Sequence, residues 1–74
     1  MNQFKYCVNI IWSEEDNCYV VELPEFANKI QRYFTHGETY QEASENAQEV
    51  LALLIESYQD ERRALPQPQT LQAT

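Results

Sequence analysis

Several residue types that define common protein classes are scarce in this sequence. Its 74 residues include one glycine and two cysteines, Cys7 and Cys18. One glycine cannot build a glycine-rich loop around a phosphate group, and two cysteines are too few for the disulfide framework of a small secreted domain. No apolar run approaches the roughly 20 residues of a membrane-spanning helix, and the chain does not open with an apolar leader and cleavage site. We therefore expect a cytoplasmic protein with reduced thiols and no membrane association.

Basic side chains are also few. Five Lys and Arg residues stand against 12 Asp and Glu residues, which gives a formal net charge of −7. A nucleic-acid-binding protein needs basic side chains to displace counterions from phosphates, so we do not expect this chain to bind nucleic acid directly. A small basic protein would suit this charge as a partner, although a net charge of this size also keeps a small domain soluble.

Residues for catalysis or metal binding are equally sparse. His36 is the one histidine, and the sequence has no Cys-x-x-Cys or His-x-x-x-His pair that would bring ligands to one ion. We therefore expect no metal and no cofactor. A nuclease that uses Asp16 and Glu22 is an alternative, but carboxylates in a solvated hairpin turn have little reason to shift their pKa for acid–base chemistry. The sequence thus favours a protein that is not an enzyme.

Two segments alternate between apolar and polar residues with a period of two, which predicts β-strands at 4–13 and 18–23. A polar turn at 14–17 joins them, and we predict an antiparallel register with Ser13 opposite Cys18, because a slip by one residue would turn the two apolar sets to opposite faces. Pro24 should end the second strand. A third strand is predicted at 32–36, with a start near Asn28 as an alternative. The predicted apolar face contains Phe4, Tyr6, Val8, Ile10, Trp12, Tyr19, Val21 and Leu23.

A long amphipathic helix is predicted from Tyr40 to about Arg62. Thr39 and Glu42 have the spacing of a capping box, in which each side chain accepts a hydrogen bond from the backbone amide of the other residue. Gly37 should supply a permissive backbone for the turn into this cap, and Arg62 with Arg63 should complement the negative end of the helix. The stripe that should face the sheet contains Ala43, Ala47, Val50, Leu51, Leu54, Ile55 and Tyr58.

These elements predict an α+β fold of order β-β-β-α, with a three-stranded antiparallel sheet packed on one long helix. Residues 1–65 would form the domain and residues 66–74 a Pro- and Gln-rich tail, with room for a short fourth strand at Thr70–Leu71. A core of this size contributes only about 3–5 kcal/mol, so we expect a homo-oligomer. The expected oligomer contacts are Cys7, Ile11, Val20 and Leu53, although a lone exposed leucine such as Leu53 is also ordinary. The expected contacts with a basic partner are Glu14, Glu15, Asp16, Glu42, Glu45 and Glu49.

Four sequence features follow one another along the chain: residues 12–16 (WSEED), residues 19–24 (YVVELP), the spaced set Gly37, Thr39, Glu42, Ala43, Asn46 and Ala47, and residues 65–68 (LPQP). In these features, from about Tyr6 to Pro68, the chain resembles the HicB-like antitoxin family of type II toxin–antitoxin systems. The resemblance implies a partial RNase H-like fold without catalytic activity, which covers HicA, a small basic toxin that cleaves mRNA with a histidine. Two features depart from the family. The residues up to Thr74 leave no room for the DNA-binding segment that members often carry, so we expect no direct binding to operator DNA, and residues 25–36 lack the usual Pro-Gly turn. A solitary protein that self-associates without a toxin is the alternative.

Overall fold

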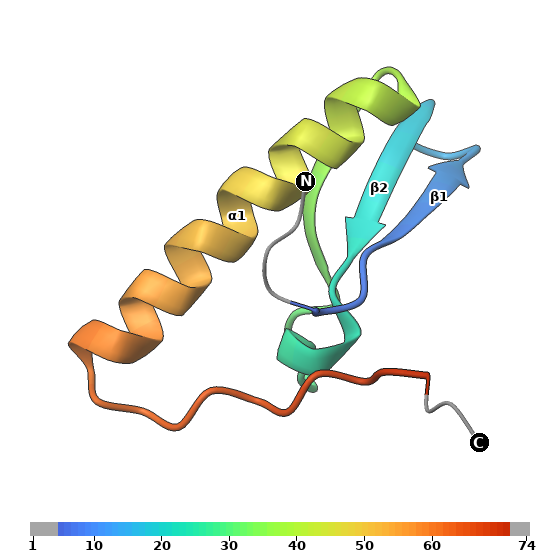
Figure 1. The fold of residues 1–74 in the computed structure, drawn as a ribbon. Helices are drawn as coiled ribbons and strands as arrows, with labels where there is room; N and C mark the ends of the chain where they lie inside the picture. Colours follow the sequence, from blue (N-terminus) through green and yellow to red (C-terminus); the bar gives the residue numbers. More distant parts are fainter. Residues whose placement is uncertain (1–4, 72–74) are drawn as a thin grey trace.

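The computed structural model describes residues 5–71 of the chain. Within this range the chain forms a three-stranded antiparallel sheet of order β1-β2-β3, with one long helix on one of its faces (Figure 1). The predicted α+β architecture is therefore confirmed. The elements are β1 (Asn9–Ser13), β2 (Cys18–Glu22), the short 3-10 helix η1 (Pro24–Phe26), β3 (Tyr33–Gly37) and α1 (Tyr40–Asp60).

The β1–β2 hairpin has the predicted register, with Ser13 opposite Cys18. Both strands are shorter than the alternation predicted: β1 begins at Asn9 and β2 ends at Glu22. The reason lies at Pro24, which has no N–H to donate to a ladder and starts η1 instead. Residues 5–8 therefore extend beyond the sheet, where their backbone finds other partners. Phe4, which we predicted for the apolar face, lies outside the described residues.

The third strand begins at Tyr33, so a start near Asn28 is wrong. The side chain of Asn28 accepts hydrogen bonds from the backbone N–H groups of Ile30 and Gln31, both at 2.8 Å. These bonds hold residues 28–31 in a turn, so this segment does not extend the strand. The β2–β3 ladder carries one irregularity, because Thr35 lies opposite Val21 while Tyr33 lies opposite Glu22. The extra residue is typical of a β-bulge, which bends the strand that carries it.

The start of α1 differs from the prediction in one bond. The Thr39 hydroxyl accepts a hydrogen bond from the amide of Glu42 at 3.0 Å, as expected. The Glu42 carboxylate accepts from the amide of Glu38 at 3.0 Å, one residue before the amide of Thr39 that we predicted. The reciprocal bond therefore secures the residue before the cap, which fixes the connection from β3 into the helix.

The helix ends two residues before the predicted position. Asp60 is its last residue, and Arg62 has a φ of 56°, a left-handed conformation that cannot continue a helix. Arg62 and Arg63 consequently do not lie in the last turn of α1, which contains no basic residue. Instead, the Arg63 guanidinium lies over the ring of Tyr58, 4.2 Å from its centroid, in a cation–π contact.

Gly37 is needed for a reason other than the one we predicted. Its φ is not positive, so no special backbone conformation requires glycine there. It is buried in β3 against the first turn of α1, where an added Cβ would lie 2.8 Å from Cα of Ala43 and 2.9 Å from the carbonyl carbon of Glu42. The absence of a side chain therefore lets the helix approach the sheet closely.

The core lies between the sheet and α1. Val50, Leu54, Tyr58, Tyr6 and Tyr19 pack around it half-buried, so the predicted apolar stripe and most of the predicted hairpin face are confirmed. Trp12 differs from the prediction: it contacts the ring of Tyr19 but remains 42% exposed outside the core. The sequence did not predict Phe26 in η1, whose ring makes edge contacts with Tyr6 at 4.9 Å and Tyr58 at 5.6 Å between centroids. The buried residues are Val21, Leu23, Phe26, Ala43, Ala47, Leu51 and Ile55.

After α1 the described part of the tail runs extended, back past η1 and the segment before β1 (Figure 1). The short fourth strand considered for Thr70–Leu71 does not form in the described part of the chain, which ends at residue 71. The carboxylate of Glu25 joins these segments, since it accepts from the amide of Gln69 at 2.9 Å and from the amide of Cys7 at 3.1 and 3.2 Å. The Tyr6 hydroxyl also donates to the carbonyl of Pro66 at 2.8 Å. We call the Glu25 carboxylate with these two amides the Glu25 clamp.

Candidate functional site

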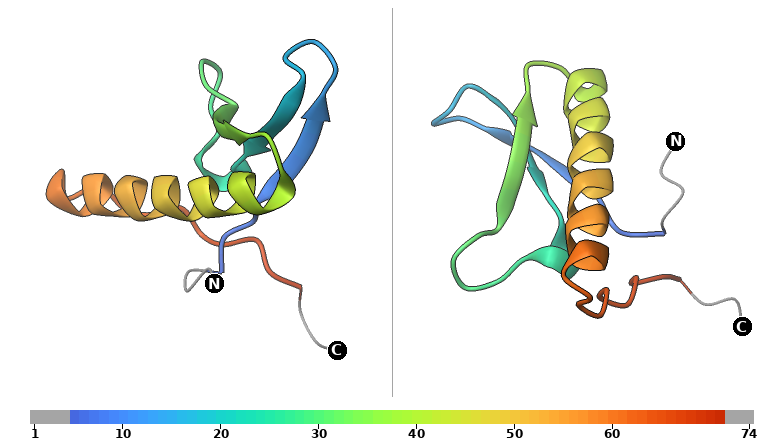
Figure 2. Two further views of the ribbon diagram at one scale, coloured as in Figure 1. Left: turned by 90° about the horizontal axis from the view of Figure 1, so that it is seen from above. Right: turned by 90° about the vertical axis from the view of Figure 1, so that its left-hand side faces the viewer.

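The sheet has one covered face and one open face. Helix α1 covers one side, and no described element covers the other (Figure 2). On the open face the structure forms a shallow hollow of about 490 Å³ beside β2 and β3. Tyr33, which is 49% exposed, contributes an aromatic ring to it. The hollow is lined by Asp16, Cys18, Val20, Tyr33, Phe34, Thr35 and His36.

The acidic β1–β2 turn borders this hollow. Its shape is fixed locally: the amide of Asn17, at a φ of 56°, donates to the carbonyl of Ser13 at 2.8 Å. The Ser13 hydroxyl donates to the Asp16 carboxylate at 3.0 Å and accepts from the Asp16 amide at 3.1 Å. Asp16 is thereby held at the edge of the hollow, and the side chains of Glu14 and Glu15 remain exposed in the same turn.

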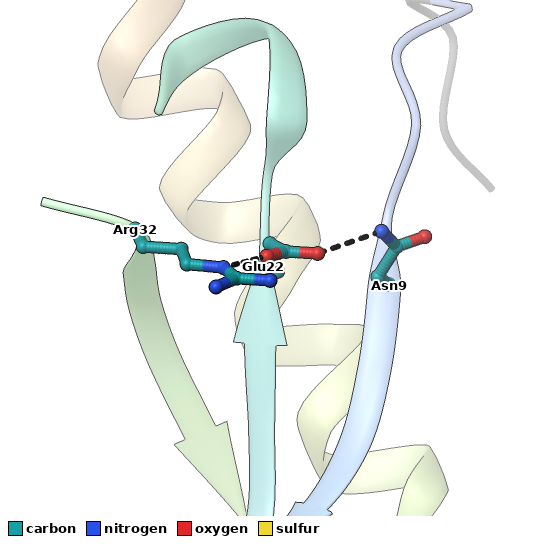
Figure 3. A network of polar contacts seen from close by, with 3 residues as sticks. All are labelled: Asn9, Glu22 and Arg32. Carbon is teal, nitrogen blue, oxygen red and sulfur yellow. Dashed lines mark hydrogen bonds and ion pairs between the residues drawn. The ribbon is translucent and has the colours of Figure 1, made fainter. Parts of the chain in front are cut away.

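At the opposite end of the open face, a basic side chain balances the negative charge. Glu22 on β2 accepts a hydrogen bond from the Asn9 side chain at 2.9 Å and forms an ion pair with Arg32 (Figure 3). The bond from Asn9 first, and then the bond from Arg32, lowers the pKa of the Glu22 carboxyl. The Arg32 guanidinium also lies 5.6 Å from the centroid of the Tyr33 ring. The uncompensated negative charge of this face is therefore concentrated at the hairpin turn.

The other acidic residues predicted to bind a partner lie on a different surface. Glu42, Glu45 and Glu49 are exposed on the side of α1 opposite the stripe that contains Ala47, as 3.6 residues per turn requires. The β1–β2 turn projects away from the helix (Figure 2). The structure therefore divides the six acidic residues between two separate surfaces, the hairpin turn and the outer side of α1.

The residues predicted to make oligomer contacts are divided as well. Ile11 and Val20 lie opposite each other in the β1–β2 ladder on the open face, and Ile11 is 41% exposed. Leu53 is 65% exposed on the outer side of α1. Cys7 lies beneath the tail, where its thiol is 3.4 Å from the carbonyl oxygen of Gln69. Partial burial, and then the nearby Glu25 carboxylate, raises the pKa of the Cys7 thiol.

The fold brings together only some of the residues that we considered for metal binding or catalysis. Cys18, His36 and Asp16 line the same hollow, whereas Cys7 is at the far end of the hairpin. Within residues 5–71 no group of three or more His, Cys, Asp or Glu side chains is placed to hold a metal ion. In the same range no helix has both the length and the apolar character to cross a membrane.

Sequence reasoning did not predict the hollow. The outward positions of β2 were visible in the alternation, but the lining from β3 depends on the strand start at Tyr33 and on the irregularity beside it. Cys18 and Val20, at the outward positions of β2, indicated that this face of the sheet is partly apolar. They did not indicate that the face is hollowed.

A model of a known protein family matches this chain. The model of the HicB_like antitoxin of bacterial toxin–antitoxin systems matches residues 5–74, nearly the whole chain. No curated protein and no solved structure matches the chain. The family match agrees with the four sequence features described above and with the three-stranded sheet and long helix. The chain therefore belongs to the HicB-like antitoxin family of bacterial toxin–antitoxin systems.

Proposed function

We propose that this protein is an antitoxin that binds a small basic mRNA-cleaving toxin of the HicA type and covers its surface. The family implies a toxin partner in general. The observation that supports a basic partner is the distribution of charge: the chain carries a net charge of −7, and within the described residues only Glu22 and Glu61 form ion pairs. The remaining exposed carboxylates are available to steer and hold a cationic protein.

A binding role without catalysis also fits the carboxylates that a nuclease would use. Glu22 is engaged by Asn9 and Arg32, and the lowered pKa of its carboxyl makes it a poor proton donor. Asp16 is held by the Ser13 hydroxyl in an exposed turn. On these contacts we infer that the protein is not an enzyme. The purified protein should therefore show no metal-dependent cleavage of RNA.

The finer fold and location follow the same proposal. We infer that the β-β-β-α order belongs to the partial RNase H-like fold that the family resemblance implies. A toxin that cleaves mRNA acts where mRNA is translated, so its antitoxin would act in the cytoplasm.

The alternative function is self-association without a toxin. It is favoured by the exposed apolar side chains of the uncovered face, where Ile11 is 41% and Tyr33 49% exposed. Sedimentation at micromolar concentration separates the two ideas. A stable monomer that still binds a toxin excludes the alternative, and an oligomer without toxin binding supports it.

Co-expression provides the direct test. Each HicA-type toxin encoded in the same genome is induced in a growth assay with and without this protein, and the purified pair is run on size-exclusion columns at low and high salt. We expect growth to be rescued and the complex to weaken as salt screens the charges. A toxin variant without its catalytic histidine serves as the control for growth. Failure of every such toxin to bind or to be neutralised would overturn the proposal.

A further inference from the structure

We propose that the basic partner docks on the open face of the sheet, between the β1–β2 turn and Tyr33, and not on the acidic outer side of α1. This inference rests on the proposed function and identifies which of the two acidic surfaces carries it. Three independent observations favour the open face: its shape, its exposed apolar side chains and the uneven distribution of charge along it.

The shape of the open face suits a protein partner. Its hollow of about 490 Å³ combines the Tyr33 and His36 rings with the apolar Val20 side chain. Exposed Ile11 extends the apolar surface, because Ile11 lies opposite Val20 in the ladder. Interface centres are enriched in aromatic side chains, and few residues in well-packed pockets supply most of the binding energy.

The outer side of α1 offers less to a partner. Its hollow near the C-terminal end is smaller, about 340 Å³, and is lined by Leu53, Glu56, Ser57, Asp60 and Glu61. Leu53 is the one apolar side chain of that lining, and Glu42, Glu45 and Glu49 are not part of it. These helical acids are solvated, so they contribute to the field of the protein without a surface on which a partner could exclude water.

Charge along the open face selects both the partner and its orientation. At one end Glu22 is neutralised by Arg32, and at the other end Glu14, Glu15 and Asp16 form no ion pair among the described residues. A partner with an apolar contact area and cationic side chains on one side would place those cations at the hairpin turn. A second copy of this chain fits poorly, because pairing two open faces would bring together two chains of net charge −7.

Two charge-matched double variants test the choice of surface. Glu14→Lys with Glu15→Lys changes the hairpin turn, and Glu45→Lys with Glu49→Lys changes α1. Each replacement changes the charge by +2, so both variants carry the same net charge of −3 in place of −7. All four positions are exposed, and circular dichroism checks that both proteins remain folded. Binding is measured by titration calorimetry with the HicA-type toxins described above, inactivated at the catalytic histidine.

We expect the hairpin variant to bind at least about tenfold more weakly than the natural sequence, and the helix variant to stay within about threefold of it. A larger loss in the helix variant, or equal losses in both, would overturn the docking surface while the proposed function stands, because the natural protein still binds. Absence of binding by the natural protein itself would overturn both.

A second pair of variants tests the apolar part without changing charge. Tyr33→Ser removes the exposed ring from the hollow, and Leu53→Ser removes an even more exposed side chain from α1. We expect Tyr33→Ser to weaken binding by about tenfold or more and Leu53→Ser to leave it unchanged. The reverse result would place the partner on the helix.

Discussion

The two faces of the sheet are built from the same three strands but differ in every physical respect. On the covered face, small side chains at Ala43 and Ala47 and the bare backbone of Gly37 let α1 approach closely, and the contact is dry and apolar. On the open face, Tyr33 and Ile11 remain in solvent beside charged residues. The covered face thus supplies the free energy of folding, and the open face is left free for recognition.

The largest expected effect is on the covered face. Leu51→Ala removes a side chain that is only 1% exposed, and the cavity should cost about 2–5 kcal/mol of unfolding free energy. Because the whole core contributes only about 3–5 kcal/mol, we expect a largely unfolded protein by circular dichroism and urea titration. Leu53→Ala, two positions along the same helix and 65% exposed, should change stability by less than about 0.5 kcal/mol. Similar losses in both variants would contradict the division between the two faces.

The next effect tests the close approach of the helix. Gly37→Ala would place a methyl group 2.8 Å from Cα of Ala43, which the backbone can relieve only by moving α1 away from β3. We expect a loss of about 1–3 kcal/mol, typical of overpacking, measured as a lower midpoint in thermal unfolding. His36→Ala changes the exposed neighbouring side chain and serves as the control. A Gly37→Ala protein as stable as the natural one would show that the helix adjusts freely.

The Glu25 clamp lies at the end of both faces and should show an intermediate effect that depends on pH. Partial burial raises the pKa of the Glu25 carboxyl, but the amides of Gln69 and Cys7 outweigh it, so the pKa is lowered in the folded protein. The unfolded chain then binds this proton more readily. The stabilisation is fully present above the ordinary glutamate pKa of about 4.3 and is lost as pH falls through the lowered value.

We therefore expect Glu25→Gln to lose about 1 kcal/mol near neutral pH, after allowance for solvent screening, and to depend less on pH below about 4.3 than the natural protein. Urea titrations from about pH 3 to about pH 7 would measure this difference in unfolding free energy. Gln69→Pro removes the amide donor in the tail and leaves the amide of Cys7 in place, so it separates the contribution of the tail from that of Cys7. Equal acid sensitivity in the natural protein and Glu25→Gln would contradict the role of the clamp.

The smallest expected effect is on the open face. Arg32→Ala breaks an ion pair whose arginine side chain is 66% exposed. Pairs with a solvated partner add little to stability, so we expect an unchanged unfolding midpoint. The pKa of Glu22 should nevertheless rise toward its ordinary value, as measured by NMR titration of the carboxyl carbon. Because the bond from Asn9 is the larger cause of the lowered pKa, Asn9→Ala should raise it further than Arg32→Ala does. The opposite order would show that the ion pair with Arg32 is the larger cause of the lowered pKa of Glu22.

The sequence predicted the parts of the fold that depend on local patterns. Alternation on both sides of the 14–17 turn admits one register that keeps the apolar sets together, and Ser13 does pair with Cys18. The Thr39 cap and the apolar stripe likewise located α1 to within two residues. Such features are determined by neighbours in the chain.

The remaining features depend on contacts between distant segments. Glu25 is an isolated acid in a loop by sequence, and its clamp exists only because Cys7 and Gln69 meet there. The role of Gly37 depends on how closely the helix approaches, which no local pattern records. The sequence predicted the open face and the acidic turn separately. That the turn borders a hollow on this face, away from the acids of α1, depends on how β3 pairs with β2 and on the irregularity in that ladder.

The Glu25 clamp also determines how the molecule would respond to tension. Cys7 and Gln69 are separated by 62 positions in the chain, yet one carboxylate binds the amides of both. The segment before β1 and the described part of the tail lie at the end of the sheet opposite the β1–β2 turn (Figure 1). A force applied through the two ends would therefore reach these few hydrogen bonds before the strand ladder, and the tail would peel away while the hairpin and its recognition surface stayed assembled.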